Sequence, residues 1–520
     1  MEQPLYAEAI LVEDGIIRAL GKKEDLAAIA GADTVRFHLN GHTLLPAFLD
    51  PHSHITSFSN TLSLAHLDGV QSFDELGSRL LSFQKERKIP AGAWITAFGY
   101  DNNFLTEGRH PDKSVLDHIL PDYPVLVTHA SGHMGVLNSA ALAALGIDSN
   151  TPDPEGGLIG RVPGTREPNG YLEETAFTLL ASKLPQPSME QLCSLMESAQ
   201  DIYLSHGITT VQDGLTKQGE WAVLKEMAEK KRLRCDIVCF VDLRDNKAIA
   251  EQNRQYVKQY RNRLKIGGYK IFLDGSPQGR TAWMTKPYLG DGPAYKGYPI
   301  YPEDTVTSFL EEGLRDQMQV LAHCNGDAAA QQFLDAYRTA REAVPSAPDI
   351  RPVMIHAQLL RRDQLPELRR LHMTASFFVA HTYYWGDVHR KNFGAERADF
   401  ISPVKSAIRE GVNYTFHQDT PVLPPDMLDT IWCAVNRITK EGSVLGPDEC
   451  VTPLEALRAV TVNAAYQYFE EDRKGSLAPG KLADLVILDR NPLKADPLSL
   501  RDIRVLETIK EGNVLYRNEK

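Results

Sequence analysis

Eight short apolar segments alternate with amphipathic helical segments along most of this chain, and this alternation restricts the folds that it can adopt. Such segments, rich in β-branched and aromatic residues, predict β-strands. Because almost every residue in them is apolar, we expect the strands to be buried on both faces, as in a parallel sheet covered by helices. The predicted strands are residues 44–54, 208–213, 234–242, 266–275, 319–326, 351–359, 373–381 and 413–420.

A succession of eight strand–helix units predicts an α/β fold. Closure of the sheet into a (β/α)8 TIM-like barrel is the favoured architecture, and an open doubly wound sheet is the alternative. One connection is too long for either, because the first predicted strand ends at residue 54 and the second begins at residue 208. We therefore expect an inserted α/β lobe at residues 57–170, placed over the barrel mouth as a lid and a substrate wall.

The two ends of the chain differ in character from the middle. Residues 1–45 and 475–520 consist of short apolar strands joined by tight turns, including the Asp-Gly and Asn-Gly pairs that are typical of hairpins. Because chain termini often lie close together, we expect both ends to form one small β-sandwich domain. The barrel domain would then occupy residues 46–474, with the lobe inserted in it.

The charge and the composition argue against several classes of protein. The 520 residues carry a formal net charge of -12 and no long basic cluster, so nucleic acid is not an expected partner. No apolar run approaches the roughly 18–20 residues of a membrane-spanning helix, and the first residues lack the pattern of a secretory signal. We therefore expect a cytoplasmic protein that does not enter the membrane. The six cysteines are scattered without the spacing of a disulfide framework, which predicts reduced thiols.

The first predicted strand ends in a pair of histidines, His52 and His54, separated by one serine. Residues i and i+2 of a strand point to the same side, so the two imidazoles would face the space beyond the end of the strand. The active sites of barrels lie at this end of the sheet. Four later strands also carry a polar side chain at or near their ends: Lys270, His323, His356 and Asp419.

These polar residues together indicate a metal site. Burying any of them without a partner would cost roughly 1–3 kcal/mol or more, and a bound metal ion offsets that cost. A single buried histidine is more often a hydrogen-bonded core residue than a ligand, but five separate strand ends with ligand-type side chains favour a metal centre. Imidazole and carboxylate ligands suit zinc, with nickel, manganese and iron as alternatives.

Several segments, in their order along the chain, resemble the amidohydrolase superfamily, and more narrowly its amidohydrolase family 3 branch, which includes N-substituted formamide deformylases. The resemblance covers nearly the whole chain and implies the barrel fold and the metal chemistry, but it leaves the substrate open. The segments are LPAFLDPHSHI, YKIFLDGS, AHCNGD, MIHAQ and HQDTPV around the expected ligands, HPDKSVLDHILPDYPVLVTHASGHMGVLNSAALAALGI, PDPEGGLIGR and PNGYLEE in the expected lobe, and SHGITTVQD and GSLAPGKLADLVILD.

The resemblance implies one or two metal ions, most simply zinc. His52, His54 and Asp419 would hold the first ion, and His323 and His356 would hold the second. A metal-bound water has its pKa lowered towards roughly 7, which provides hydroxide at neutral pH. Asp419 would act as the general base and then as the general acid for the leaving nitrogen.

Lys270 has two possible roles. By the resemblance it would bridge the two ions as a carbamate formed with carbon dioxide, because a free ammonium cannot bind a cation. The alternative is an ion pair with Asp274 or Asp419, in which case a single metal ion would remain.

The expected reaction is hydrolysis of a C–N bond other than a peptide bond, in a small amide, formamide, carbamate or cyclic amide with an apolar or aromatic substituent. An alternative on the same site is hydrolysis of an ester, a lactone or a phosphoester. An alternative of another class is a degenerate barrel that acts as a ligand-binding or scaffold protein, against which the complete set of ligands argues. A homodimer is expected because symmetric pairs are the commonest assembly.

The substrate pocket is less specified than the metal centre. The resembled branch often has a glycine-serine pair before the last aspartate, whereas this chain has His417 and Gln418 there, which would alter the floor of the pocket. Arg280 would either meet a substrate carboxylate or fix its own loop. The candidates for substrate contacts are His133 in the lobe, Arg280, and His381, Tyr383 and Trp385 after the seventh strand.

Overall fold

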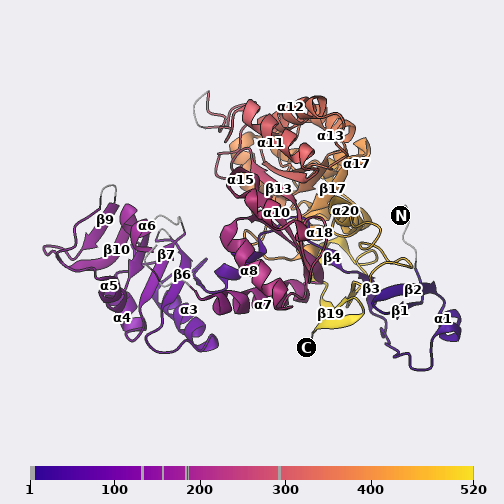
Figure 1. The fold of residues 1–520 in the computed structure, drawn as a ribbon. Helices are drawn as coiled ribbons and strands as arrows, with labels where there is room; N and C mark the ends of the chain where they lie inside the picture. The colour runs from indigo at the N-terminus through magenta and orange to yellow at the C-terminus, as the bar shows by residue number, and fades with distance from the viewer. Residues whose placement is uncertain are drawn as a thin grey trace. The chain divides into compact units, whose positions relative to one another are not determined.

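The computed structural model describes residues 6–102, 104–130, 134–154, 157–181, 184, 187–290 and 294–518. The chain divides into two compact units (Figure 1). The larger unit comprises Met1–Phe58 and Met196–Lys520, and the second comprises Ser59–Leu195. Each unit has its own sheet and its own hydrophobic core.

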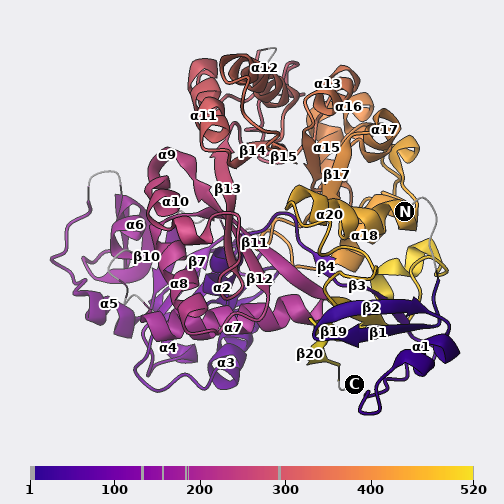
Figure 2. The same cartoon turned by 45° about the vertical axis from the view of Figure 1, so that its right-hand side comes forward.

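The larger unit is built around a curled, eight-stranded parallel sheet whose strands follow one another in chain order (Figure 2). Each of the eight predicted apolar segments contributes one strand to this sheet, which confirms the predicted α/β class. The strands are β4 (Phe48–Leu49), β11 (Ile208–Thr216), β12 (Asp236–Asp242), β13 (Leu264–Phe272), β14 (Gln319–Cys324), β15 (Val353–His356), β16 (Thr374–Phe377) and β17 (Asn413–Phe416).

Amphipathic helices connect these strands. In α12 (Asp327–Ala343), Phe333, Ala336, Tyr337 and Ala340 are buried at spacings of three and four residues, which places them on one face of the helix. The other helices of eight or more residues in or leading into this unit are α7 (Met189–Ser205), α8 (Gln218–Glu229), α11 (Glu303–Arg315), α15 (Gly386–Phe393) and α18 (Met427–Asn436). The shorter ones are α9 (Leu243–Asn246), α10 (Ala248–Gln252), α13 (Leu365–Arg370), α14 (His381–Tyr384), α16 (Ala395–Asp399), α17 (Val404–Glu410), α19 (Pro453–Ala459) and α20 (Val462–Gln467).

The two outer strands of the sheet, β4 and β17, are not joined by a ladder among the described strands. The backbone N–H of Leu49 in β4 donates instead to the carbonyl of Val460, beyond α19, at 2.9 Å. Past the strand ends, the N–H of His54 donates to the carbonyl of Thr420 at 2.8 Å. The segments that follow β4 and β17 are therefore held together directly, where the predicted ligands lie.

Apolar side chains fill the interior of the curled sheet. Leu49, Val238, Phe240, Leu321, Val353 and Ile355 from four strands form one buried cluster with Ala464, Ala465 and Tyr468, which come from α20 and the residue after it. Fully burying each leucine, valine, isoleucine or phenylalanine contributes roughly 1.5–3 kcal/mol. The interior is thus a packed apolar core.

Residues from both ends of the chain pair in a second, four-stranded antiparallel sheet of the larger unit (Figure 2). An N-terminal hairpin, β1 (Ala9–Glu13) with β2 (Ile16–Gly21), shares its core, in which Ile17 packs with Leu485 and Ile509. The strands of the sheet, in spatial order, are β20 (Asn513–Arg517), β19 (Val505–Lys510), β18 (Leu485–Leu488) and β3 (Thr43–Pro46). A short helix, α1 (Lys23–Ile29), follows the hairpin.

The predicted strand at residues 44–54 is wrong in its extent. Its first part is β3, which pairs with β18 in the terminal sheet, and its second part is the two-residue β4, which pairs with β11 in the parallel sheet. Ala47 lies between them, and the histidine pair follows β4 outside any strand. One apolar segment therefore serves two sheets, a division that its uniform hydrophobicity does not reveal.

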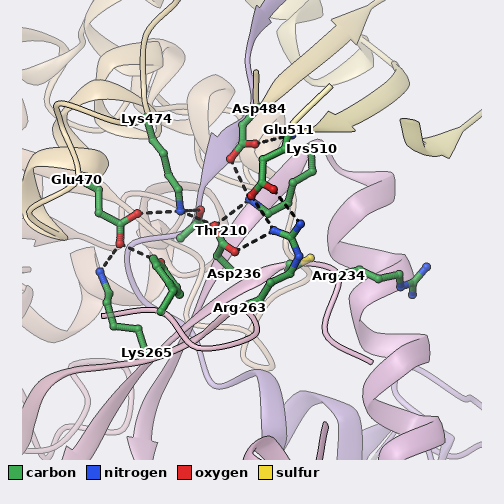
Figure 3. A network of polar contacts seen from close by, with 12 residues as sticks. Thr210, Arg234, Asp236, Arg263, Lys265, Glu470, Lys474, Asp484, Lys510 and Glu511 are labelled. Carbon is green, nitrogen blue, oxygen red and sulfur yellow. Dashed lines mark hydrogen bonds and ion pairs between the residues drawn. The ribbon is translucent and has the colours of Figure 1, made fainter. Parts of the chain in front are cut away.

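A buried network of charges joins the terminal sheet to the parallel sheet (Figure 3). Asp236, the first residue of β12, accepts hydrogen bonds from Lys474 Nζ at 2.6 Å, Lys510 Nζ at 2.8 Å and an Arg263 guanidinium nitrogen at 3.1 Å. Burial raises the pKa of Asp236, but the two ammonium groups outweigh it and hold the pKa of this carboxyl well below its usual value. The further members are Thr210, Lys265, Glu470, Asp484 and Glu511.

The second unit contains a six-stranded mixed sheet with a separate core. It extends past residue 170, because β10 lies between β8 and β9 in the sheet and α6 packs on both β9 and β10. The strands are β5 (Ala65–His66), β6 (Ile95–Tyr100), β7 (Val125–His129), β8 (Met134–Leu137), β9 (Gly157–Arg161) and β10 (Pro168–Glu174). The helices are α3 (Phe73–Glu86), α4 (Lys113–Ile119), α5 (Ser139–Leu145) and α6 (Thr175–Ala181), with α2 (Ile55–Thr61) leading into the unit.

Two further expectations concern the chain as a whole. The six cysteines are all free thiols, as predicted, and five of them are buried. Within the described residues, no helix combines the length and the apolarity needed to cross a bilayer.

Candidate metal centre

The predicted ligands come from strands that are far apart in the sequence and meet at the carboxyl end of the parallel sheet. His356 is the last residue of β15, and His323 is the last but one of β14. Lys270 is the third residue from the end of β13, and its side chain is fully buried. The remaining three, His52, His54 and Asp419, follow the outer strands β4 and β17.

His52 and His54 do not lie in a strand, and backbone contacts with β11 hold the pair in place. Gly214 N–H donates to the Ser53 carbonyl at 2.7 Å, and the backbone of His54 forms an isolated antiparallel β-bridge with Asp213. A Cβ atom on Gly214 would lie 2.6 Å from the His52 ring, so only glycine permits this close approach. The two imidazole rings still converge, with centroids 5.1 Å apart.

The orientation of His52 is fixed by a glutamine. His52 Nδ1 lies 2.6 Å from Gln212 Oε1, and the Gln212 amide nitrogen donates to the Pro51 carbonyl at 2.7 Å. Because the amide nitrogen is occupied as a donor, Oε1 is the acceptor and the Nδ1 of His52 carries the hydrogen. The Nε2 atom of His52 is therefore left with a free lone pair that faces the site.

Asp419 is the point on which the two histidines converge. Its Oδ1 lies 3.4 Å from His52 Nε2 and 3.3 Å from His54 Nε2, yet it has no hydrogen-bond partner among the described residues. Burial raises the pKa of Asp419, but the neighbouring imidazoles of His54, His356 and His52 outweigh it and hold the pKa of this carboxyl well below its usual value. Burying a carboxylate oxygen without a hydrogen bond is costly unless a cation lies beside it.

These three residues can hold a metal ion. One ligand atom from each lies within 4.8 Å of the other two. Two imidazole nitrogens and a carboxylate oxygen form the donor set of many zinc sites. Burial and the nearby Lys270 lower the pKa of His52 well below its usual value, which keeps its imidazole neutral and able to act as a ligand.

Lys270 lies beside this group without a carboxylate partner. Its Nζ is 3.2 Å from His52 Nε2 and 5.3 Å from the centre of the Phe272 ring. Within the described residues, neither Asp274 nor Asp419 comes close enough to form the ion pair considered as its alternative role. Burial lowers the pKa of Lys270 to about 7, against an opposing effect of Asp419, so a large fraction of the amine is neutral at neutral pH. The neutral amine is the form that adds carbon dioxide.

His323 and His356 form the other side of the cluster. Their ring centroids are 4.5 Å apart, and His356 Nε2 lies 3.9 Å from Asp419 Oδ2. Ile355 belongs to the interior core, so regular strand alternation would turn His356 away from the interior. The backbone of His356 adopts a φ of 73° and breaks this alternation. Asp419 also has a positive φ, of 56°, and such strained conformations cluster at functional sites.

Two residues that the sequence analysis considered in other roles, Asp274 and His417, support this side of the cluster. Asp274 accepts backbone hydrogen bonds from Asn325 at 2.9 Å and Gly326 at 2.7 Å, and its Oδ1 lies 3.3 Å from His323 Nδ1 without good hydrogen-bond geometry. His417, fully buried, lies 3.2 Å from His356 Nδ1. The spacing of His417 and Asp419 repeats that of the first histidine pair, which is the signal that could have indicated its role.

The predicted substrate residues fall into two groups. His381 is buried with its ring 4.6 Å from Phe378 and 4.5 Å from Trp385, and Phe378 in turn lies 5.3 Å from the ring of His417 in the cluster. His381 Nδ1 is 3.0 Å from His389 Nε2, a second buried histidine that the sequence did not indicate. His381 and Trp385 therefore border the candidate metal centre.

The other predicted contacts have different surroundings. Tyr383 packs against Trp432 at 5.4 Å and lies under the Arg501 guanidinium at 4.6 Å. Arg280 donates to the carbonyl of Leu289 and so ties its own loop together. His133 lies outside the described residues.

Comparisons of this chain with known proteins agree on one family. A profile described as the amidohydrolase family matches residues 37–516. The putative amidohydrolase YtcJ of Bacillus subtilis (strain 168) is 28% identical, over 99% of this chain and 97% of its own. The N-substituted formamide deformylase of Arthrobacter pascens is 28% identical, over 98% of this chain and 95% of its own. A crystal structure of an uncharacterized metal-dependent hydrolase from Pyrococcus furiosus has a TM-score of 0.75 and 27% identity, over 93% of this chain and 95% of that one.

The family match extends over nearly all the elements described above, from before β3 to the last strand, β20. It confirms the resemblance found in the sequence motifs. The similar solved structure, itself described as a metal-dependent hydrolase, covers 93% of this chain. This chain therefore belongs to the amidohydrolase family, within a superfamily of metal-dependent hydrolases.

Proposed function

We propose that this protein hydrolyses a C–N bond, other than a peptide bond, in a small amide, formamide, carbamate or cyclic amide. The observation that carries the proposal is the convergence of His52 Nε2 and His54 Nε2 on the buried Asp419 Oδ1, which has no hydrogen bond among the described residues. The similarity to a relative named as a formamide deformylase supports a C–N bond as the target.

The donor atoms fit one or two divalent ions, and zinc is the ion that we propose. His52, His54 and Asp419 would hold one ion, and His323 and His356 a second, with Lys270 joining them as a carbamate. When bound, such ions supply Lewis acidity towards the substrate carbonyl and lower the pKa of water. The low pKa of Lys270 favours the neutral amine that a carbamate requires.

Asp419 has the central role among the protein's own groups. Its low pKa keeps it ionised at neutral pH, so it can accept a proton from the attacking water. Returning that proton to the leaving nitrogen completes the cleavage, because an amine anion is a poor leaving group. His381 and Trp385, packed around Phe378, would form the side of the pocket that receives an apolar or aromatic substituent.

Metal removal tests this proposal. The purified protein is expected to contain transition metal, to hydrolyse members of a panel of N-substituted formamides, amides, carbamates and cyclic amides, and to lose this activity on chelation. Re-addition of zinc should restore it, because the protein's own groups alone cannot polarise the carbonyl. Elemental analysis and product quantification are the measurements.

Matched substrates separate the alternatives. Activity confined to the esters, lactones or phosphoesters that correspond to the same panel would favour the alternative reaction. A protein that binds no metal after supplementation and turns over no member of the panel would contradict hydrolysis and favour a binding or scaffold role. An Xaa-Pro dipeptide in the panel tests whether peptide bonds are excluded.

Lys270→Ala is expected to weaken metal binding at least about tenfold, with a parallel loss of turnover, because the bridging anion is removed. Short carboxylic acids such as acetate should restore part of the metal content by entering the space left by the side chain. Lys270→Met is the matched control, since methionine fills that space and should prevent rescue. Unchanged metal content in both variants would exclude a bridging role.

A further inference from the structure

Three histidines of the candidate centre each have a different polar group beside their Nδ1 atom. His52 Nδ1 is bonded to the amide oxygen of Gln212 at 2.6 Å, and His323 Nδ1 lies 3.3 Å from the Asp274 carboxylate. His356 Nδ1 is instead 3.2 Å from the Nε2 atom of another histidine, His417. Amide and carboxylate oxygens can only accept, whereas an imidazole nitrogen can donate or accept.

The surroundings of His417 leave it few degrees of freedom. It is fully buried directly after β17, and its Nδ1 lies 2.8 Å from the Ser376 hydroxyl on β16. Its ring is 5.1 Å from the ring of His52 and 5.3 Å from that of Phe378. Both ring nitrogens of His417 are thus engaged, one by a metal-ligand candidate and one by a hydroxyl.

The direction of these hydrogen bonds decides whether His356 can bind a metal. If His417 donated to His356, the hydrogen of neutral His356 would sit on Nε2, which faces Asp419, and no lone pair would be available there. If His356 Nδ1–H donates to His417 Nε2, the lone pair of His356 Nε2 is free. His417 Nδ1–H then donates to the Ser376 oxygen, which accepts. Only the second arrangement is compatible with a ligand role for His356.

We infer that His417 is a positioning residue that accepts the Nδ1 hydrogen of His356 and thereby holds His356 Nε2 ready for the metal. The inference rests on the proposed function, because it concerns the same metal centre. His417 and Gln418 stand where the resembled branch often has a glycine-serine pair. His356 has a φ of 73° at the end of β15, and the Nε2 atom of His417 lies 3.2 Å from its Nδ1 atom.

The test compares two substitutions of His417, by glutamine and by asparagine, whose side-chain amides differ in their distance from the backbone. The Oε1 of glutamine can occupy the place of His417 Nε2, whereas the oxygen of asparagine reaches only to the place of Nδ1. His417→Gln should therefore keep metal affinity close to that of the unchanged protein, and His417→Asn should weaken it by about 10–100-fold. Competition with a chromophoric chelator for zinc measures the affinity, and elemental analysis gives the stoichiometry.

His389→Asn is the matched control, because His389 is equally buried but is bonded to His381 and not to a predicted ligand. It should leave zinc affinity unchanged. Circular dichroism of the metal-free variants checks that all three keep their fold. Equal affinity of the glutamine and asparagine variants at position 417, or an equal loss in the control, would overturn the inference. A protein without zinc affinity before any substitution would instead overturn the proposed function.

Discussion

Asp419→Asn is expected to lower kcat by about 10²–10⁴-fold while most of the bound metal stays in place. The asparagine oxygen can still approach a cation between His52 and His54, but the amide cannot accept a proton from water. Steady-state kinetics on the best substrate, together with elemental analysis of the same preparation, measures both quantities. The two results must be read together, since loss of metal alone would also abolish turnover.

Asp426→Asn provides the matched control for this substitution. Asp426 lies a short distance further along the chain, where its Oδ1 accepts from Leu428 N–H and Asp429 N–H at the start of α18. Asparagine caps a helix about as well as aspartate, so both fold and turnover should be preserved. Turnover by Asp419→Asn within a few fold of that of the control would exclude Asp419 as the general base.

Asp236→Asn is expected to reduce the free energy of unfolding of the larger unit by about 3–5 kcal/mol. Asp236 accepts hydrogen bonds from Lys474, Lys510 and Arg263, and the two lysine side chains are almost completely buried. The amide removes one negative charge and leaves these cations under-compensated in a medium of low polarity. Urea unfolding followed by tryptophan fluorescence is the measurement, because Trp221, Trp283, Trp385 and Trp432 lie in this unit and only Trp94 lies in the other.

Glu226→Gln makes the same chemical change at the surface. Glu226 pairs with Lys230 at 2.8 Å along α8, and both side chains are substantially exposed. Exposed pairs of this kind contribute only about 0.3–0.5 kcal/mol, so the unfolding midpoint should hardly move. If Asp236→Asn shifted the midpoint no more than this control, the network would have no role in attaching the terminal sheet to the parallel sheet.

Much of the parallel sheet could be predicted from local patterns. Each strand is a short apolar run with turn-forming residues at its ends, and the burial that produces this pattern acts on every strand separately. The polar residues that close these runs, such as Lys270, His323 and His356, were visible for the same reason, because they interrupt an apolar stretch. Their common location then followed from the rule that parallel strands end at the same edge.

Other features could not be predicted, because they depend on residues that are distant in the sequence. The segment 44–54 divides between two sheets only because β18 and β11 are both available to pair with it. Gln212, which orients His52, gives no signal of its own in β11. The predicted pocket residues show the same limit, since Tyr383 packs on Trp432 while its neighbour His381 borders the metal centre.

The sequence by itself determined which side chains stand at the strand ends and therefore which chemical groups the site contains. The tertiary structure alone decided which nitrogen of each histidine faces Asp419, because that choice depends on partners such as Gln212 and His417 from other strands. The physical reason is that strand periodicity is a property of neighbouring residues. A hydrogen bond that selects one imidazole nitrogen over the other exists only after distant segments have come together.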